Sequence, residues 1–289
     1  MTASTLLPFC LMIIMFAMGL GIGAKDFKRV IVMPKAIMVG LAGQLLLLPL
    51  IAMTCAYIYD LSATMSAGLL LLSLCPGGIT SNLMAKLAKA DEALSVSLTV
   101  ISSLIGVFSV PLLFNLLVTN FGVGSAAFVL PLLDTIKKIF ILTLLPVSAG
   151  MLIAHYAGSY REILERWFIR TGTVTLIILV CLIWYDQFDL ISNSFAKMGP
   201  AALTLNITSM LAGAGLGLLF GLNQQQTKTM CLEVGLQNSS LAFFIAINLL
   251  DNRELTVAAA CYSPLMFLTA FSIPIFQRFK NNPVAKAIN

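Results

Sequence analysis

Charged residues are scarce in this sequence. Only 10% of its 289 residues are Asp, Glu, Lys or Arg, while 59% are hydrophobic, and soluble domains carry about 25% charged residues. A soluble fold of this size needs a charged surface that the chain cannot supply. The net charge of +5 is small and scattered, unlike the basic stripe of a nucleic-acid-binding protein. We therefore expect a membrane protein with no nucleic-acid partner.

Residues for metal, disulfide and hydrolytic chemistry are also few. The chain has one histidine and six cysteines, and each cysteine stands singly in an apolar segment. Zinc sites, iron–sulfur sites and a secreted disulfide scaffold are therefore not expected. The apolar stretches hold no paired aspartates and no serine–histidine or serine–lysine dyad, so we do not expect an enzyme. His155 falls at a helix end, where a solvated side chain is expected.

Long apolar stretches are what the sequence has in abundance. About 20 apolar residues are needed for a helix to cross a hydrocarbon core of ~30 Å, and a membrane β-barrel would instead show short alternating segments. We predict an all-α polytopic membrane protein, a single transmembrane unit over residues 1–289. Its nine transmembrane helices are expected near 6–23, 36–57, 66–87, 93–118, 129–154, 171–185, 200–221, 228–249 and 255–276.

The positive residues predict the direction in which these helices run. If the N-terminus is outside, 13 of the 17 lysines and arginines, Lys286 among them, fall on the inner side. The outer segments hold only Lys137, Lys138, Lys197 and Arg253. Because inner loops are enriched in Lys and Arg, we predict a multi-pass protein of the cell inner membrane with a cytoplasmic C-terminus. The first stretch has no basic segment before it, so it does not read as a secretory signal.

Small residues in the seventh stretch predict close helix packing. Gly213, Gly217 and Gly221 recur every four residues. Such a row lets two helices approach closely in a membrane.

Two stretches contain residues that interrupt a helix. The third reads CPGGITSN over 75–82, and the eighth reads EVGLQNSS over 233–240. Unpaired backbone groups cost several kcal/mol in lipid, so broken segments occur where they are buried in protein or line water. The two breaks occupy matching places, in the middle of stretches two to four and seven to nine, as in inverted-repeat transporters. The alternative is a pair of kinked helices with incidental polar residues.

Glu233 is the acidic residue that falls in the interior of a predicted span. A carboxylate there costs at least ~2.5 kcal/mol on insertion scales. No lysine or arginine inside another span offers an ion pair. A proton or a bound cation must compensate the charge, and a permanently protonated, hydrogen-bonded glutamate is the alternative.

Oxygen-bearing side chains near the breaks favour a cation. Ser95 and Thr99 are four residues apart and share one helix face, as do Glu233 and Gln237. Further side-chain oxygens belong to Ser81, Asn82 and Gln44. Hard oxygen ligands without a soft one suit an alkali cation. Taken singly, however, buried Ser, Thr and Gln are more often hydrogen-bond partners between helices. The N-termini of the half-helices after the breaks could hold an anion.

These motifs resemble those of the bile acid:sodium symporter family, of the bacterial type. Pro76-Gly77-Gly78 leading to Ser81-Asn82, and then Asp91 through Ser95 and Thr99, is similar to the first crossing segment of that family and the helix after it. The segment 233–239 is similar to the second, and the resemblance runs across nearly the whole chain.

The resemblance implies a fold of two domains with two crossing discontinuous helices. The core domain would be formed by about 36–118 and 200–276, and the panel domain by about 6–23 and 129–185. Bacterial members have ten helices in two inverted five-helix repeats. This chain would lack the first helix, which leaves an inverted repeat of four plus five.

The resemblance also implies two sodium sites and a substrate cavity. The first sodium site would be formed by Ser81, Asn82, Ser95, Thr99 and Glu233. The second would be formed by Gln44, Glu233, Gln237 and the backbone carbonyls of Val234 and Leu236. The substrate cavity would lie between core and panel, near Thr80, Asn238 and Ser239. The His-Asn pair of bacterial bile-acid binders is missing from 263–268, so a smaller carboxylate such as pantoate competes with bile acids as the substrate.

The sequence therefore predicts a secondary transporter in the lipid bilayer. It would take up a small organic anion with two sodium ions by alternating access, and no obligate protein partner is evident. The alternative keeps the fold and makes Glu233 a proton carrier, in a proton-coupled transporter or exporter. A passive channel or a sensor would share the spans but show no sodium coupling.

Overall fold

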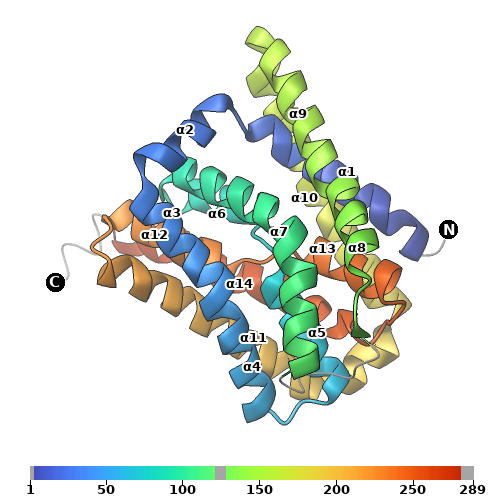
Figure 1. Cartoon of the computed structure of the whole chain (residues 1–289). Helices are drawn as coiled ribbons and strands as arrows, with labels where there is room; N and C mark the ends of the chain where they lie inside the picture. The colour runs from blue at the N-terminus through green and yellow to red at the C-terminus, as the bar shows by residue number, and fades with distance from the viewer. Residues whose placement is uncertain (1–2, 121–127, 281–289) are drawn as a thin grey trace.

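The computed structural model describes residues 3–120 and 128–280, and every regular element within them is a helix (Figure 1). The α-helices are α1 (Ala3–Gly21), α2 (Ala24–Val32), α3 (Pro34–Ala42), α4 (Leu48–Ile58), α5 (Ala63–Leu74), α6 (Ile79–Leu87), α7 (Glu92–Asn120), α8 (Leu132–Ile139), α9 (Leu145–Tyr156), α10 (Arg161–Asp186), α11 (Phe188–Leu219), α12 (Gln224–Gly235), α13 (Ser239–Phe244) and α14 (Thr256–Lys280). π-Helical turns span Gly43–Leu47, Phe140–Leu144 and Ile245–Leu249, and a 3-10 turn spans Gly158–Tyr160.

Within the described residues, seven helical segments are long and apolar enough to cross a membrane, and one of them contains the break between α12 and α13. They are Pro34–Ile58, Glu92–Asn120, Leu132–Tyr156, Glu162–Asp186, Phe188–Leu219, Gln224–Leu249 and Thr256–Ile275. The pair α5 and α6 meets the same criteria but is bent by 62°, and Thr5–Gly21 is a shorter apolar helix. The predicted class, an all-α multi-pass membrane protein, is confirmed for this part of the chain.

Two helices begin well before the predicted spans. The sequence places the sixth span at 171–185 and the seventh at 200–221, whereas α10 begins at Arg161 and α11 at Phe188. Apolar composition marks only the residues that meet hydrocarbon, but the backbone hydrogen-bond ladder continues through the charged turns beyond it. Pro200 lies inside α11 without ending it.

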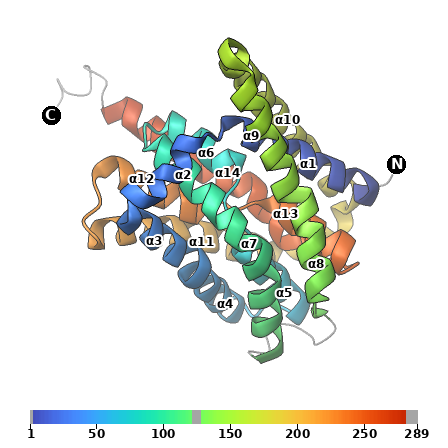
Figure 2. The same cartoon turned by 45° about the horizontal axis from the view of Figure 1, so that its top comes forward.

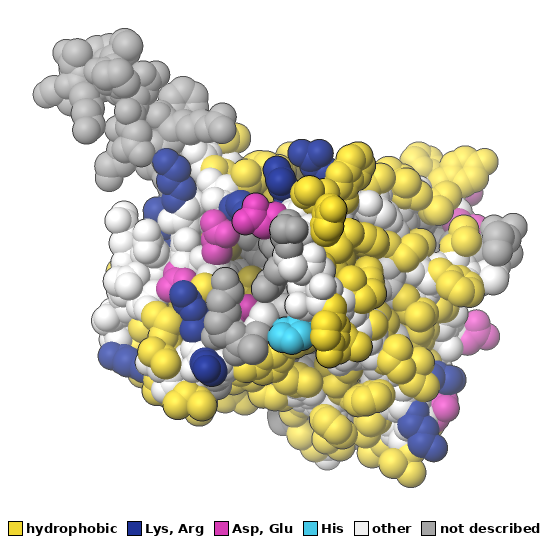
Figure 3. Space-filling view, turned by 90° about the horizontal axis from the view of Figure 1, so that it is seen from above, with side chains coloured by type: hydrophobic (Ala, Val, Ile, Leu, Met, Phe, Trp, Pro, Cys, Tyr) yellow, Lys and Arg dark blue, Asp and Glu magenta, His cyan; other side chains and the backbone are white. Residues whose placement is uncertain are grey.

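Several helices pack side by side along their length. Helix α1 packs along α9 and α10, and these three lie together at the upper right in Figures 1 and 2. Helix α11 packs along α12 and α14, and α5 packs against α4, α7 and α14. Seen from above, charged side chains gather around a hollow, while hydrophobic side chains cover much of the remaining surface (Figure 3).

Close packing of α11 on α12 depends on glycines. A Cβ atom at Gly213 would lie 2.3 Å from the carbonyl oxygen of Met230, and one at Gly217 would lie 2.9 Å from Cα of Thr227. The predicted role of these two glycines is therefore confirmed. The prediction is wrong for Gly221, because nothing lies within 4 Å of its Cβ position. Its φ of +63° instead suits the turn that ends α11, where glycine is favoured.

A reciprocal pair of hydrogen bonds aligns α7 with α12. The N–H of Asp91 donates to Oγ1 of Thr229 at 3.0 Å, and the Thr229 hydroxyl lies 3.0 Å from the Asp91 carbonyl oxygen. Residues four apart lie one above the other on a helix face. Ser95 and Glu233, each four residues further along, therefore lie one turn from a fixed junction.

Candidate functional site

Both predicted helix breaks are present, and they touch each other. Helix α5 ends at Leu74 and α6 begins at Ile79, while α12 ends at Gly235 and α13 begins at Ser239. The backbone N–H of Asn238, in the second break, donates to the carbonyl oxygen of Pro76, in the first, at 3.0 Å. Residues about 160 positions apart in the chain thus form one site.

Glu233 lies beside this junction with no exposed surface. Its carboxylate forms a group, here called the carboxylate cluster, with Asn82, Ser95 and Thr99. Oγ of Ser95 lies 2.5 Å from Oε1 of Glu233 and 2.8 Å from Oδ1 of Asn82. Oγ1 of Thr99 lies 3.1 Å from Oε2 of Glu233 and 3.3 Å from Oδ1 of Asn82. Two hydroxyl protons face three acceptor oxygens, so the cluster is rich in unshared lone pairs.

No positive side chain neutralises this cluster among the described residues. Their five ion pairs involve other carboxylates: Asp60, Asp91, Glu92, Asp134 and Asp186. Burying an unpaired carboxylate is costly. A hard cation coordinated by carboxylate, hydroxyl and amide oxygens would remove that cost.

Gly77 leaves the space that this arrangement needs. A Cβ atom there would lie 3.0 Å from Oε2 of Glu233 and 3.3 Å from Oγ of Ser81. Ser81 is fully buried, and its hydroxyl donates to the Gly78 carbonyl at 2.9 Å. The glycine in the first break therefore lets the Glu233 carboxylate and the Ser81 hydroxyl approach the backbone.

Two buried glutamines, here called the amide pair, lie at the end of α12. Gln44, in a π-helical turn, donates from Nε2 to the Glu233 carbonyl oxygen at 2.9 Å. Gln237 donates from Nε2 to the Val234 carbonyl oxygen, also at 2.9 Å. The Oε1 atom of each is buried without a hydrogen-bond partner. An orphaned buried amide oxygen is costly, and a cation bound by both would satisfy them.

The residues expected near the substrate are buried at the starts of the half-helices. Thr80 lies in the first turn of α6, and Asn238 caps α13 by accepting from the Leu241 N–H at 3.1 Å. The Ser239 hydroxyl is buried and unpaired. The cavities described below are lined by other residues.

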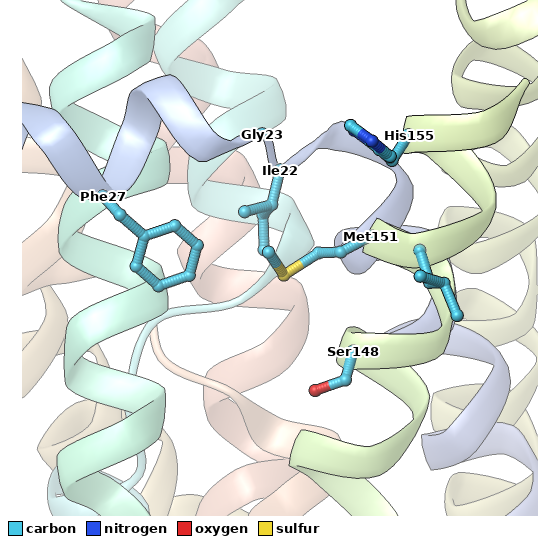
Figure 4. A pocket seen from close by; sticks show the side chains of 7 residues that line it. Ile22, Gly23, Phe27, Ser148, Met151 and His155 are labelled. Carbon is cyan, nitrogen blue, oxygen red and sulfur yellow. The ribbon is translucent and has the colours of Figure 1, made fainter. Parts of the chain in front are cut away.

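Two cavities lie beside α1. One of about 80 Å³ is bounded by α1, α6, α7 and α10 and reaches Asn82, Lys86 and Glu92. A larger one of about 380 Å³ is lined by Ile22, Gly23, Phe27, Ser148, Met151, Leu152 and His155. Met151 points across it toward Ile22 (Figure 4). The sequence does not reveal this cavity, because the cavity exists only when the end of α1 lies beside α9. From the sequence, His155 is predicted only to be a solvated residue.

Three polar residues near the second break are not among those predicted from the sequence. Asn206, Tyr262 and Thr269 form a hydrogen-bonded group around the Gly235 carbonyl. The sequence signal for this group is a lone asparagine inside the seventh predicted span, since polar side chains are rare inside a membrane and have partners there.

Known proteins resemble this chain along most of its length. The model of the sodium bile acid symporter family matches residues 8–194. The human ileal sodium/bile acid cotransporter is 30% identical over 88% of this chain and 72% of its own length. An uncharacterized sodium-dependent transporter, YocS, of Bacillus subtilis is 28% identical over 84% of this chain and 74% of its own length.

A plant relative is longer than this chain. The probable sodium/metabolite cotransporter BASS2, chloroplastic, of Oryza sativa subsp. japonica is 28% identical over 93% of this chain. The match covers only 63% of the rice protein, which is less than two thirds of its length. All three relatives are named as transporters rather than as enzymes.

Proposed function

Because this chain belongs to the sodium bile acid symporter family, we propose that it is a secondary transporter that carries a small organic anion across the membrane together with sodium. The observation that supports this most is the carboxylate cluster. A fully buried, unpaired glutamate with hydroxyl and amide oxygens around it is a site for a transported cation.

Two sodium ions would bind where the breaks meet. The first uses Ser81, Asn82, Ser95, Thr99 and Glu233, and the carboxylate cluster supports it. The second uses Gln44, Glu233, Gln237 and the carbonyls of Val234 and Leu236, and the unpaired oxygens of the amide pair support it. Glu233 belongs to both sets, so sodium binding would join the two broken helices into one rigid unit.

The anion would bind near Thr80, Asn238 and Ser239, next to the sodium sites. The substrate class is a bile acid or a smaller carboxylate such as pantoate. The transporter would work by alternating access, with a core of about 36–118 and 200–276 moving against a panel of about 6–23 and 129–185. The packing of α1 on α9 and α10, and of α11 on α12 and α14, is consistent with that division.

We also propose nine spans in an inverted repeat of four plus five, with the N-terminus outside and the C-terminus in the cytoplasm of the cell inner membrane. The seven apolar helical segments, the bent pair and the short apolar α1 would supply these spans. The charge asymmetry of the loops supports the orientation, although Lys286 lies outside the described residues.

The test is uptake into proteoliposomes with radiolabelled pantoate and taurocholate as probes. Sodium in the external buffer should accelerate uptake of one of them, and Glu233→Ala should abolish the sodium-dependent part. Glu254→Gln is the control, because Glu254 is an exposed carboxylate. Sodium-driven uptake that survives in Glu233→Ala would refute the ligand role of Glu233.

The second candidate is proton coupling through the same carboxylate. Complete burial of Glu233 suits a proton carrier as well as a cation ligand. Replacing sodium with choline at fixed pH separates the two. Unchanged uptake in choline that responds to a pH gradient would favour the proton and exclude the sodium mechanism.

A further inference from the structure

The end of α12 leaves three successive carbonyls without their helical partners. In an unbroken helix the carbonyls of residues 233–235 would accept from N–H groups four positions further on. Here the N–H of Asn238 donates to Pro76 and that of Ser239 donates to the Gln237 carbonyl oxygen. Side chains satisfy these carbonyls instead, since broken backbone at membrane depth needs other hydrogen-bond partners.

The first two carbonyls and the third are satisfied in different ways. The carbonyls of Glu233 and Val234 accept from the amide pair, whose residues belong to the proposed second sodium site. The Gly235 carbonyl accepts from outside that site. Nδ2 of Asn206 and the hydroxyl of Tyr262 each donate a hydrogen bond to it, both at 2.7 Å.

These two donors come from separate helices and are themselves held in place. Asn206, on α11, and Tyr262, on α14, have no exposed surface and lie 3.2 Å apart between Nδ2 and the phenol oxygen. The hydroxyl of Thr269, on α14, lies 2.5 Å from Oδ1 of Asn206, which fixes the direction of the amide. This group of Asn206, Tyr262 and Thr269 is here called the Gly235 clamp.

Helix α11 also fixes how closely the second break can approach it. A Cβ atom at Gly235 would lie 2.1 Å from Cγ of Met210, so the break packs closely against this side chain of α11. Met210 is four residues after Asn206 and lies on the same face. The Gly235 peptide is therefore held by close packing against Met210 and by two hydrogen bonds.

We propose that Asn206 and Tyr262 are positioning residues for sodium binding. By holding the Gly235 carbonyl they fix the peptide between Gly235 and Leu236. That peptide sets the direction of the carbonyls on either side of it, those of Val234 and Leu236, which are assigned to the second sodium ion. The inference rests on the proposed sodium-coupled function and adds residues from α11 and α14 that contact no ion themselves.

The test is a sodium titration of thermal unfolding in detergent, with choline chloride keeping the ionic strength constant. A bound ion stabilises the folded state by mass action, so sodium should raise the Tm of the unmodified protein. Fitting the dependence of Tm on sodium concentration gives the apparent Kd, which is the half-saturating sodium concentration. Tyr262→Phe removes one of the two clamp donors and should raise the half-saturating sodium concentration roughly fivefold to tenfold, the loss typical of one buried hydrogen bond. Thr269→Val should shift it in the same direction by less.

The matched control is Tyr59→Phe. This variant also removes a tyrosine hydroxyl that is hydrogen-bonded to α11, since the Tyr59 oxygen lies 2.7 Å from Oγ1 of Thr204. Tyr59, however, does not contact the break. Its half-saturating sodium concentration should equal that of the unmodified protein.

The outcomes distinguish the clamp from the proposed function. If Tyr262→Phe and Thr269→Val lower the Tm in choline but keep the original half-saturating concentration, the clamp is only structural and the inference is wrong. A shift in Tyr59→Phe as large as that in Tyr262→Phe would also overturn it. If sodium does not stabilise the unmodified protein at all, the proposed function fails and this inference fails with it.

Discussion

At the scale of single residues, the function proposed for Glu233 depends on a neighbour that has no side chain. Gly77 leaves its Cβ position 3.0 Å from Oε2 of Glu233, a distance at which a methyl group would displace the carboxylate. The carboxylate cannot move freely, because Ser95 and Thr99 hold it from the other side. The geometry of the carboxylate cluster is therefore sensitive to one added carbon.

We expect Gly77→Ala to weaken sodium binding while leaving the fold intact. Inserting a methyl group into a packed site typically costs about 1–3 kcal/mol, so the half-saturating sodium concentration for uptake should rise by about tenfold or more. The control is Gly106→Ala, whose Cβ would meet Pro76 of the same break at an ordinary 3.4 Å and no polar atom. Equal sodium dependence in the two variants would show that Gly77 serves only the backbone of the break.

At the scale of elements, the contact between α11 and α12 places the second break. Gly213 brings the backbone of α11 against the carbonyl of Met230, three residues before Glu233. That contact involves backbone on both sides, so neither helix can yield as a flexible side chain would.

Gly213→Ala should therefore lower thermal stability in detergent, by about 1–3 kcal/mol or more, in sodium and in choline alike. Gly215→Ala, two residues away on the same helix, meets nothing within 4 Å and should be neutral, or stabilising by about 0.5–1 kcal/mol through helix propensity. A Gly213→Ala protein that unfolds at the original temperature would mean that the helices separate without cost.

The sequence predicts elements better than it predicts which elements meet. Hydropathy places the apolar helices, and glycines with polar residues place both breaks, helped by Pro76 in the first, because these signals are local. It marks Glu233, Ser95 and Thr99 as one chemical set, because spacing of four residues and a lone carboxylate are visible in the chain. Asn206 stands out in the sequence as a lone asparagine in a span, but its grouping with Tyr262 does not, since α11 and α14 must first pack on the same carbonyl. The π-helical turn that presents Gln44 has no sequence signature either.

At the scale of the whole molecule, the uneven distribution of charge predicts how the membrane potential acts on transport. Most lysines and arginines fall in the segments expected inside, which fits a protein inserted with its N-terminus outside. The buried site itself has a net negative side chain and no positive one among the described residues. Cations that enter it from outside therefore move their charge in the direction that an inside-negative potential favours.

Transport of two sodium ions with one monovalent anion moves one net positive charge inward. An inside-negative potential of 100 mV then contributes about 2.3 kcal/mol, which is about a 50-fold increase in the accumulation ratio of the anion. Proteoliposomes loaded with potassium and treated with valinomycin, at a fixed sodium gradient, should show this increase in steady-state pantoate or taurocholate. With one sodium ion per monovalent anion, the cycle is electroneutral and valinomycin leaves accumulation unchanged. An anion that crosses alone is expelled by the same potential, so the sign of the response separates symport from a passive channel. Its size gives the number of sodium ions that move with each anion.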